Sequence, residues 1–413
     1  MNVRNHMWVL NSVIQDMLRR KGAEPIDVQI LYIRQCFDAL WPEECLSDLF
    51  QYGIQDHTIN ILYDSSLNTQ LAIRTPVGIT ERENVDKTVM QGDVWAPSLC
   101  ATSIDSIGKE CLKENKYLYK YKGNGKIPPL AMLDDVCAIS TCGVEAVKLN
   151  SFLNYKISSK KLQCGKNKCK KMHIGNTRKE NICSPLYIDD WKETDVTSVE
   201  TGITHIEDTY EGEIALETTL GEKYLGDQIY VDGKNYLNVA FRRNKGAGLK
   251  NEISALLVEM MAGDEHFTMA TLLRNSCLVS SMIFNCEAWY GLNLKQIKIL
   301  EREDENLMRK VIGCPSKTPI HLMYLELGWL PLRFIIQSRR LNFLKYILNQ
   351  KETSLVKQVF NVQKSNPQRS DWVNIVAKDM RKLKIYLTHE EITSMSKYMF
   401  KKIVKQKCEE NII

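Results

Sequence analysis

The feature that most constrains this chain is a stretch, residues 128–140, in which two adjacent aspartates interrupt two short apolar runs. Aspartate favours turns and the flanking residues suit strands, so the stretch predicts a strand, a tight turn and a second strand. Asp134 and Asp135 are then expected at the hairpin tip. Two like charges at one tip repel each other, and a divalent cation such as Mg²⁺, which prefers hard oxygen ligands, would offset that repulsion. The alternative is an ordinary hairpin whose turn faces water.

Length and composition indicate a globular protein of more than one domain. The chain has 413 residues, 44% of them hydrophobic and 25% charged, which allows two or more domains with a sizeable core. No uninterrupted apolar run approaches the ~18 residues of a membrane span, and the N-terminus lacks the apolar core of a signal peptide. We therefore expect an intracellular protein, cytoplasmic or nuclear, without a membrane partner. The 13 cysteines are scattered, mostly in apolar runs, which predicts reduced thiols and no disulfide partner.

Charge is unevenly distributed along the chain. Residues 156–180 carry nine Lys or Arg against one acid, a local net charge of +8, whereas residues 184–222 carry 11 acids against Lys192. The basic block predicts a phosphate-contacting face, and the acidic block predicts a solvated insertion that polyanions would avoid. Both blocks could equally be ordinary solvated surface.

The order of the expected elements is informative. Hydrophobic spacing predicts a helix over residues 4–20, a strand over 26–33, and a turn and helix over 34–50. Residues 71–78 predict a strand and turn, residues 90–100 a loop that enters an apolar helix, and residues 117–121 alternate as a strand does. The Asp-Asp hairpin follows, and then a Lys-rich segment that ends Met172-His173-Ile174-Gly175.

This series of pieces, with Met90-Gln91-Gly92-Asp93 and Tyr224-Leu225-Gly226-Asp227 in order around the hairpin, resembles the palm of a non-LTR retrotransposon reverse transcriptase. The resemblance covers most of the chain. It implies an α+β fold, a polymerase palm with an antiparallel sheet and helices, followed by an all-α thumb. It also implies an RNA template, a DNA primer and dNTP as partners, with Mg²⁺ as the cofactor of RNA-directed DNA synthesis.

In such polymerases three carboxylates hold two Mg²⁺ ions, which activate the primer 3′ oxygen and stabilise the leaving diphosphate. By resemblance, Asp134 and Asp135 are two of the three, and the third position is Tyr32. A phenol is neutral at pH 7 and offers one oxygen, so metal binding should be badly weakened. Asp38 and Asp27 are too far along the chain to stand in for it.

Further roles follow from the same resemblance. The nucleotide-binding positions are those that match the family's aromatic under the sugar, its loop along the templating base and its triphosphate lysine: Phe37, Gln91, Gly92 and Lys168. The nucleic-acid-binding positions come from the element after the palm and the first thumb helix: Tyr224, Leu225, Gly226, Arg242, Arg243 and Lys245. A core aromatic and solvated lysines are the alternatives from the residues alone.

A zinc site built on Cys164, Cys169 and His173, with Cys183 later, is rejected. The Cys-x2-Cys spacing of the familiar zinc knuckles is absent, and the segment already suits a strand.

The expected domains are a palm with partial fingers over 1–180, an acidic insertion over 181–222, the palm end and helical thumb over 223–350, and a basic helical region over 351–413. The family's endonuclease and most of its fingers motifs are not found, which suggests a truncated, degenerate copy. We therefore predict a reverse-transcriptase lineage with impaired activity. A non-catalytic nucleic-acid-binding remnant is the alternative, and an unrelated basic helical interaction protein is a third.

Overall fold

The chain forms two units, an α/β unit of Lys21–Lys120 with Lys126–Leu220, and a helical unit of Met1–Arg20, Tyr121–Gly125 and Gly221–Ile413. The computed structural model describes residues 2–20, 24–66, 69–84, 89–90, 92–114, 117–175, 184–197, 204–259 and 264–412. This division differs from the expected domains, because the first helix belongs with the C-terminal helices rather than with the sheet. Residues 351–413 likewise belong to the helical unit.

Strand β1 (Ile26–Tyr32) is the centre of a five-stranded sheet in the α/β unit, in the order β11-β8-β1-β7-β6. β1 pairs antiparallel with β7 (Asp135–Thr141) and β8 (Lys170–Ile174), and β6 (Leu130–Met132) pairs antiparallel with β7. The edge strand β11 (Glu217–Thr218) runs parallel to β8, so the sheet is mixed rather than purely antiparallel. Four of the seven residues of β1 are isoleucine, valine or leucine, as expected for a strand buried on both faces, but Asp27 and Gln29 are buried in it as well.

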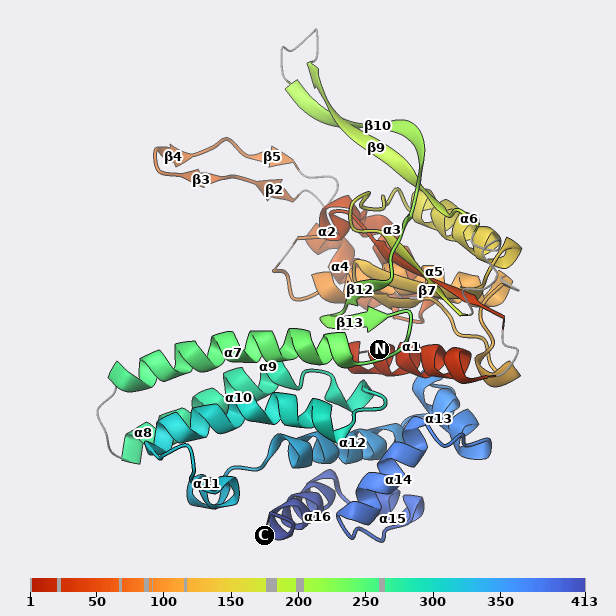
Figure 1. Cartoon of the computed structure of the whole chain (residues 1–413). Coiled ribbons are helices and arrows are strands. Elements are labelled where there is room, and N and C mark those ends of the chain that lie inside the picture. Colours follow the sequence, from red (N-terminus) through yellow and green to blue (C-terminus); the bar gives the residue numbers. More distant parts are fainter. Residues whose placement is uncertain are drawn as a thin grey trace. The chain divides into compact units, whose positions relative to one another are not determined.

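In the described part of this unit, five helices, four short strands and one long hairpin accompany the sheet. The helices are α2 (Cys36–Ala39), α3 (Pro42–Gln51), α4 (Asp56–Ser66), α5 (Ala96–Glu114) and α6 (Val144–Ser159), with α2 only one turn long. The short strands are β2 (Gln70–Leu71), β3 (Arg74–Thr75), β4 (Gly78–Ile79) and β5 (Glu83–Asn84). The acidic block forms the long hairpin of β9 (Tyr187–Thr197) and β10 (Thr204–Ala215), drawn in yellow-green in Figure 1.

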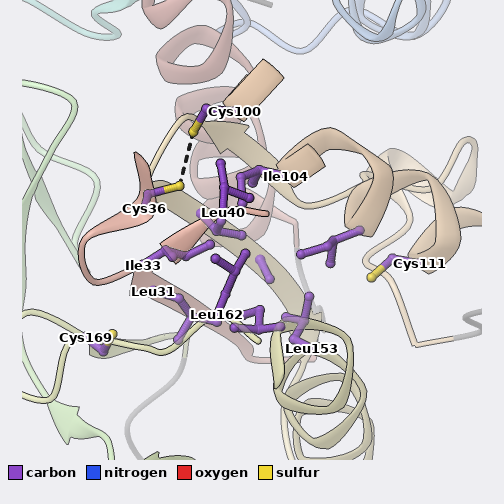
Figure 2. Packing of buried hydrophobic residues seen from close by; sticks show 14 of the residues in the cluster. Leu31, Ile33, Cys36, Leu40, Cys100, Ile104, Cys111, Leu153, Leu162 and Cys169 are labelled. Carbon is purple, nitrogen blue, oxygen red and sulfur yellow. Dashed lines mark hydrogen bonds between the residues drawn. The ribbon is translucent and has the colours of Figure 1, made fainter. Parts of the chain in front are cut away.

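One apolar core joins the sheet to its helices. Leu31 in β1 and Ile33 directly after it share this core with Leu40, which follows α2, and with Ile104 of α5 and Leu153 of α6 (Figure 2). The thiols of Cys36 and Cys100 lie 3.1 Å apart in the same core, and Figure 2 draws this contact as a dashed line. This packing holds the end of β1, where the predicted site residues lie, against α2 and α5.

The helical unit contains the helix expected over residues 4–20 and a series of further helices after residue 235. They are α1 (Val3–Arg19), α7 (Tyr236–Glu259), α8 (Asp264–Leu273), α9 (Ser280–Met282), α10 (Leu294–Ile312), α11 (Ile320–Leu327), α12 (Leu332–Leu348), α13 (Leu355–Ser365), α14 (Trp372–Lys382), α15 (His389–Ser394) and α16 (Lys397–Glu410). Short helical turns lie at Tyr121–Gly123, Arg274–Val279 and Cys286–Ala288, and one hairpin, β12 (Gly221–Tyr224) and β13 (Asp227–Tyr230), precedes α7.

Local signals are accurate here. Asn293 and Gln296 form a capping box at the start of α10, and Gly313 ends that helix in the left-handed conformation at φ 70°. By contrast, residues 117–121 do not form the predicted strand; in that segment Lys120 makes an isolated bridge to Lys126.

Among the residues that the structure describes, one helical segment, Glu265–Ala288, is long and apolar enough by length and composition to cross a membrane, with a mean hydropathy of 1.2 over its most apolar window. The core helix of a soluble protein passes the same test. Arg274 within this segment donates to both carboxylate oxygens of Asp304 in α10, at 2.7 and 2.6 Å, and both side chains are buried. The segment therefore packs inside the helical unit through at least one buried ion pair.

Candidate functional site

Tyr32 and Asp135 lie directly opposite each other at the ends of β1 and β7. Opposed residues of an antiparallel pair project their side chains on the same face, so the phenol and the carboxylate are neighbours. The hairpin loop consists of Leu133 and Asp134, and Asp135 is the first residue of β7, so only one of the two aspartates occupies the tip where both were expected. Leu133 has φ 56°, and the carbonyl of Asp134 accepts from the N–H of Ile33 at 2.8 Å, which fixes this tip against β1.

A segment far along the chain, residues 163–169, covers the same end of β1. The N–H of Gly165 donates to the carbonyl of Tyr32 at 2.8 Å, and the N–H of Arg34 donates to the carbonyl of Gln163 at 2.8 Å. A Cβ on Gly165 would lie 3.1 Å from Cδ1 of Tyr32, so glycine allows this close approach. The segment carries Lys168 across the site, where its ammonium lies 3.8 Å from the centroid of the Tyr32 ring.

The electrostatics of the site concern Asp135 above all. Burial, and after it the neighbouring charge of Asp134, raises the pKa of the Asp135 carboxyl to about 6, although the Lys168 ammonium acts in the opposite direction. The lysine thus supplies the positive charge that the carboxylate pair needs. It does so from an exposed position, resting on an aromatic face through a cation–π contact.

The donor set does not fit two magnesium ions. Asp134 and Asp135 provide two carboxylates, and the third position is the phenol of Tyr32. Asp38 is exposed on α2, and Asp27 lies at the opposite end of β1, five residues or ~17 Å away. The pair could hold at most one weakly bound Mg²⁺, because charge and ligand number both decrease when a carboxylate is replaced by a neutral oxygen.

Of the other predicted nucleotide-binding residues, the structure describes Phe37 and Gly92 but not Gln91. Phe37 lies in α2, half-buried against the core, and its carbonyl accepts from the N–H of Val89 at 2.9 Å. This bond brings the segment before Gly92 beside α2. Gly92 is exposed with φ 99°, a left-handed conformation that suits glycine, whereas Gln91 lies outside the described residues.

The predicted nucleic-acid-binding residues divide into buried and exposed members. Leu225 and Gly226, at φ 45° and 85°, form the two-residue turn of the β12–β13 hairpin, as a type I′ turn requires. Tyr224 is 1% exposed, so its side chain is not offered at the surface.

Arg242 is also enclosed, at 3% exposure. It donates to Oδ1 of Asp227 and to the carbonyl of Gly226, both at 2.6 Å, and so ties the hairpin to α7. Its placement is that of a structural ion pair rather than of a phosphate contact. Arg243 and Lys245 are the exposed members, with Arg243 reaching Glu303 at 3.4 Å.

The basic block is largely neutralised within its own unit. Three of its lysines form ion pairs with nitrogen-to-oxygen distances of 2.6–2.7 Å: Lys156 with Glu110, Lys160 with Asp48 and Lys166 with Asp190. Lys170 also pairs with Glu217. Two of these acids, Asp190 and Glu217, come from the acidic block. The predicted phosphate face is therefore narrower than the sequence suggests, with Lys161 over the Trp41 ring at 4.1 Å and Lys168 over Tyr32 as its exposed lysines beside aromatic rings.

Sequence reasoning missed Gly165 and Cys169 as neighbours of Tyr32. The thiol of Cys169 accepts from the N–H of Tyr32 at 3.2 Å. A glycine inside a dense run of lysines was the available signal, because such a glycine marks a close approach of two backbones. Cys183, named with the rejected zinc site, lies outside the described part of the chain.

Comparisons with known proteins leave the family open. No protein-family model matches the sequence, and no curated protein matches it. Among solved structures, the chain is similar to a telomerase from Candida tropicalis in complex with a TWJ fragment of telomeric RNA, with 10% identity, a TM-score of 0.39, and 85% of this chain and 51% of that chain covered. It is also similar to the corresponding Candida albicans telomerase complex, with 12% identity, a TM-score of 0.33, and 85% and 52% covered. The chain spans about half the length of these structures, and a likeness of this size does not establish a shared function.

Proposed function

We propose that this chain derives from an RNA-templated DNA polymerase of the non-LTR retrotransposon type, and that its present role is to bind nucleic acid, with nucleotidyl transfer weak or lost. In this proposal the α/β unit corresponds to a palm and the helical unit to a thumb. The single observation that carries it is the register that puts Tyr32 opposite Asp135 at the tip of a palm-like hairpin.

The chemistry of the site supports the loss of transfer. Two-metal catalysis needs ligands that bring both ions to the attacking and leaving oxygens. When Mg²⁺ is bound, it supplies charge and polarises these oxygens. Here Asp134 and Asp135 would hold such an ion, Tyr32 would add one neutral oxygen, and the Lys168 ammonium already offsets part of the carboxylate charge.

The same residues support retained binding. An ammonium such as that of Lys168 attracts phosphate oxygens but cannot coordinate the primer 3′ oxygen as a metal ion does. Exposed Arg243 and Lys245 on α7 add positive charge in the helical unit. Contacts of this kind bind the phosphate backbone without reading its sequence, and they weaken steeply as salt rises.

Primer extension tests the proposal. The assay uses an RNA template, a DNA primer, dNTPs and Mg²⁺, with the natural chain, Tyr32→Asp and Asp134→Ala. We expect little extension by the natural chain, restored extension by Tyr32→Asp, and none by Asp134→Ala. Tyr155→Asp is the matched control, because it adds the same charge at an exposed tyrosine of α6 in the same unit.

Binding of the same template and primer, followed by fluorescence anisotropy over a range of salt concentrations, completes the test. Salt-dependent binding without extension in every variant supports the non-catalytic remnant. Extension by the natural chain that Asp134→Ala abolishes contradicts the loss of transfer. Neither binding nor extension in any variant overturns the nucleic-acid role altogether.

A further inference from the structure

A second group of metal-binding side chains lies at the opposite end of β1 from Tyr32. Asp27 is opposite His173 of β8 on one side and opposite Ser140 of β7 on the other. Cys142 follows β7 by one residue, and its N–H donates to the carbonyl of Pro25 at 3.0 Å. Cross-strand partners project on one face, so three neighbouring strands direct an acid, an imidazole and a thiol to the same place.

The ligand atoms converge. Nδ1 of His173 lies 3.2 Å from Sγ of Cys142 and 3.0 Å from Oδ1 of Asp27, and all three ligand atoms lie within 4.8 Å of one another. In a tetrahedral zinc site, ligand atoms at ~2.0–2.3 Å from the ion are separated from each other by about 3.3–3.8 Å. The three side chains therefore stand close to three vertices of such a tetrahedron.

One oxygen of the Asp27 carboxylate, Oδ1, faces His173, but the other, Oδ2, has no partner among the described residues. The Asp27 side chain is 0% exposed, and no hydrogen-bond donor within the described ranges reaches its Oδ2. The neighbouring Oγ of Ser140 is likewise buried and lacks a partner among those residues. A buried carboxylate oxygen without a partner is costly, and coordination of a cation would satisfy Oδ2 of Asp27.

A Cys–His–Asp catalytic arrangement is the rival interpretation, and the geometry disfavours it. Such a triad uses the two different ring nitrogens of the histidine, one toward the nucleophile and the other toward the acid. Here the thiol and the carboxylate both approach Nδ1 of His173. One nitrogen cannot accept from the thiol and donate to the acid at once, whereas a shared ion would satisfy all three groups.

We propose that Asp27, Cys142 and His173 hold a zinc-class divalent cation, with a water in the fourth position. A thiolate, an imidazole and a carboxylate are the mixed soft and hard donors that Zn²⁺ accepts and Mg²⁺ does not favour. The ion ties β7, β1 and β8 together at the end of the sheet away from Asp135. This site is independent of the proposed polymerase ancestry.

Metal titration of the full chain tests this site. Co²⁺ is the probe, because a cobalt–thiolate bond has a charge-transfer absorption band that oxygen ligands do not produce, and Zn²⁺ competition then gives the zinc Kd. We expect one Co²⁺ per chain with that band, and displacement by Zn²⁺. Cys142→Ser should abolish the band, and His173→Gln should weaken zinc binding at least ~tenfold.

Cys277→Ser is the matched control, because it removes a half-buried thiol of the helical unit and should leave the band unchanged. Circular dichroism of each variant shows whether it has folded, and the zinc content of the natural chain after purification is read independently of any variant. A natural chain that takes up neither Co²⁺ nor Zn²⁺, or a band that persists in folded Cys142→Ser, overturns the proposal.

Discussion

The two ends of β1 differ in which potential metal ligands they carry and in what balances the negative charge of those ligands. At Tyr32 the chain has two carboxylates and a neutral phenol, with the Lys168 ammonium 3.8 Å from the phenol ring. At Asp27 it has a buried carboxylate, a thiol and an imidazole, with one carboxylate oxygen that lacks a partner within the described residues. A side-chain cation, Lys168, supplies positive charge at one end, and the proposed zinc-class ion would supply it at the other. A single strand therefore carries a site that the sequence motif predicts at one end and a site that only the folded sheet brings together at the other.

The largest expected effect is on stability. Saturating Zn²⁺ at 100 times its Kd should raise the free energy of opening β1, β7 and β8 by about 2.7 kcal/mol, because the ion binds only the folded site. Hydrogen exchange of the amides of these strands, with chelator and then with added Zn²⁺, measures it. Mg²⁺ at the same concentration is the control and should have little effect. Equal protection of these amides from exchange by Zn²⁺ and by Mg²⁺ would show that the Asp27 end of β1 does not prefer zinc.

Asp135→Asn should change the pH dependence of stability. The pKa of Asp135 is raised to about 6 by burial and by Asp134, so the folded state binds a proton more tightly than the unfolded state. Stability from this group therefore falls as pH rises from about 4 to about 6, and the cost of roughly 1–3 kcal/mol is fully present above that window.

The amide removes this ionisation, so the variant should gain stability relative to the natural chain above pH 6 and lose the slope. Denaturant unfolding at several pH values measures the difference. Asp38→Asn, at an exposed position on α2, is the control that should leave the slope intact. A slope unchanged in Asp135→Asn would mean that Asp135 is not the responsible group.

Tyr32→Asp should make the Asp134 and Asp135 end of β1 a better binding site for a divalent metal ion. A third carboxylate beside Asp135 raises the ligand charge and should tighten Mn²⁺ or Mg²⁺ binding at least ~tenfold, or about 1.4 kcal/mol. Without metal, the new charge lies opposite Asp135 and should destabilise the strand pair. Mn²⁺ titration followed by electron paramagnetic resonance reads the affinity, and unchanged binding would show that ligand number does not limit this site.

Lys168→Met gives the smallest expected effect. Loss of an exposed cation–π contact costs about 0.5–1 kcal/mol, and loss of the ammonium should raise the pKa of Asp135 above its present value of about 6. An NMR titration of the Asp135 carboxyl measures the shift. Lys166→Met is the control, since Lys166 pairs with Asp190 instead. An unchanged Asp135 pKa in Lys168→Met would show that the lysine charge does not act on the carboxylates.

Sequence patterns predicted the elements with strong local signals. The capping box of Asn293 and Gln296 and the left-handed Gly313 are properties of a few adjacent residues, so α10 could be placed closely. The strand β1 and the hairpin of β6 and β7 could likewise be predicted from short runs of adjacent residues. The alternation at residues 117–121 did not produce a strand. The N–H of Tyr119 donates to the carbonyl of Ile139 in β7, but the segment then turns at Tyr121 instead of continuing along β7.

The candidate sites depended on contacts between distant residues. The motif order predicted Asp134, Asp135 and Tyr32 together, and the strand register brings Tyr32 to Asp135. Nothing local places Lys168 on the Tyr32 ring, because that contact depends on how residues 163–169 return to β1. Asp27, Cys142 and His173 lie more than a hundred residues apart at the extremes and meet only through the sheet register.

Anomalous scattering from crystals soaked separately in Zn²⁺ and Mn²⁺ tests the contrast between the two ends of β1 most directly. The account predicts a zinc peak among Asp27, Cys142 and His173, and no pair of manganese peaks at Asp134 and Asp135. Two manganese ions beside Asp134 and Asp135 in the natural chain, or no zinc at Asp27, would contradict it.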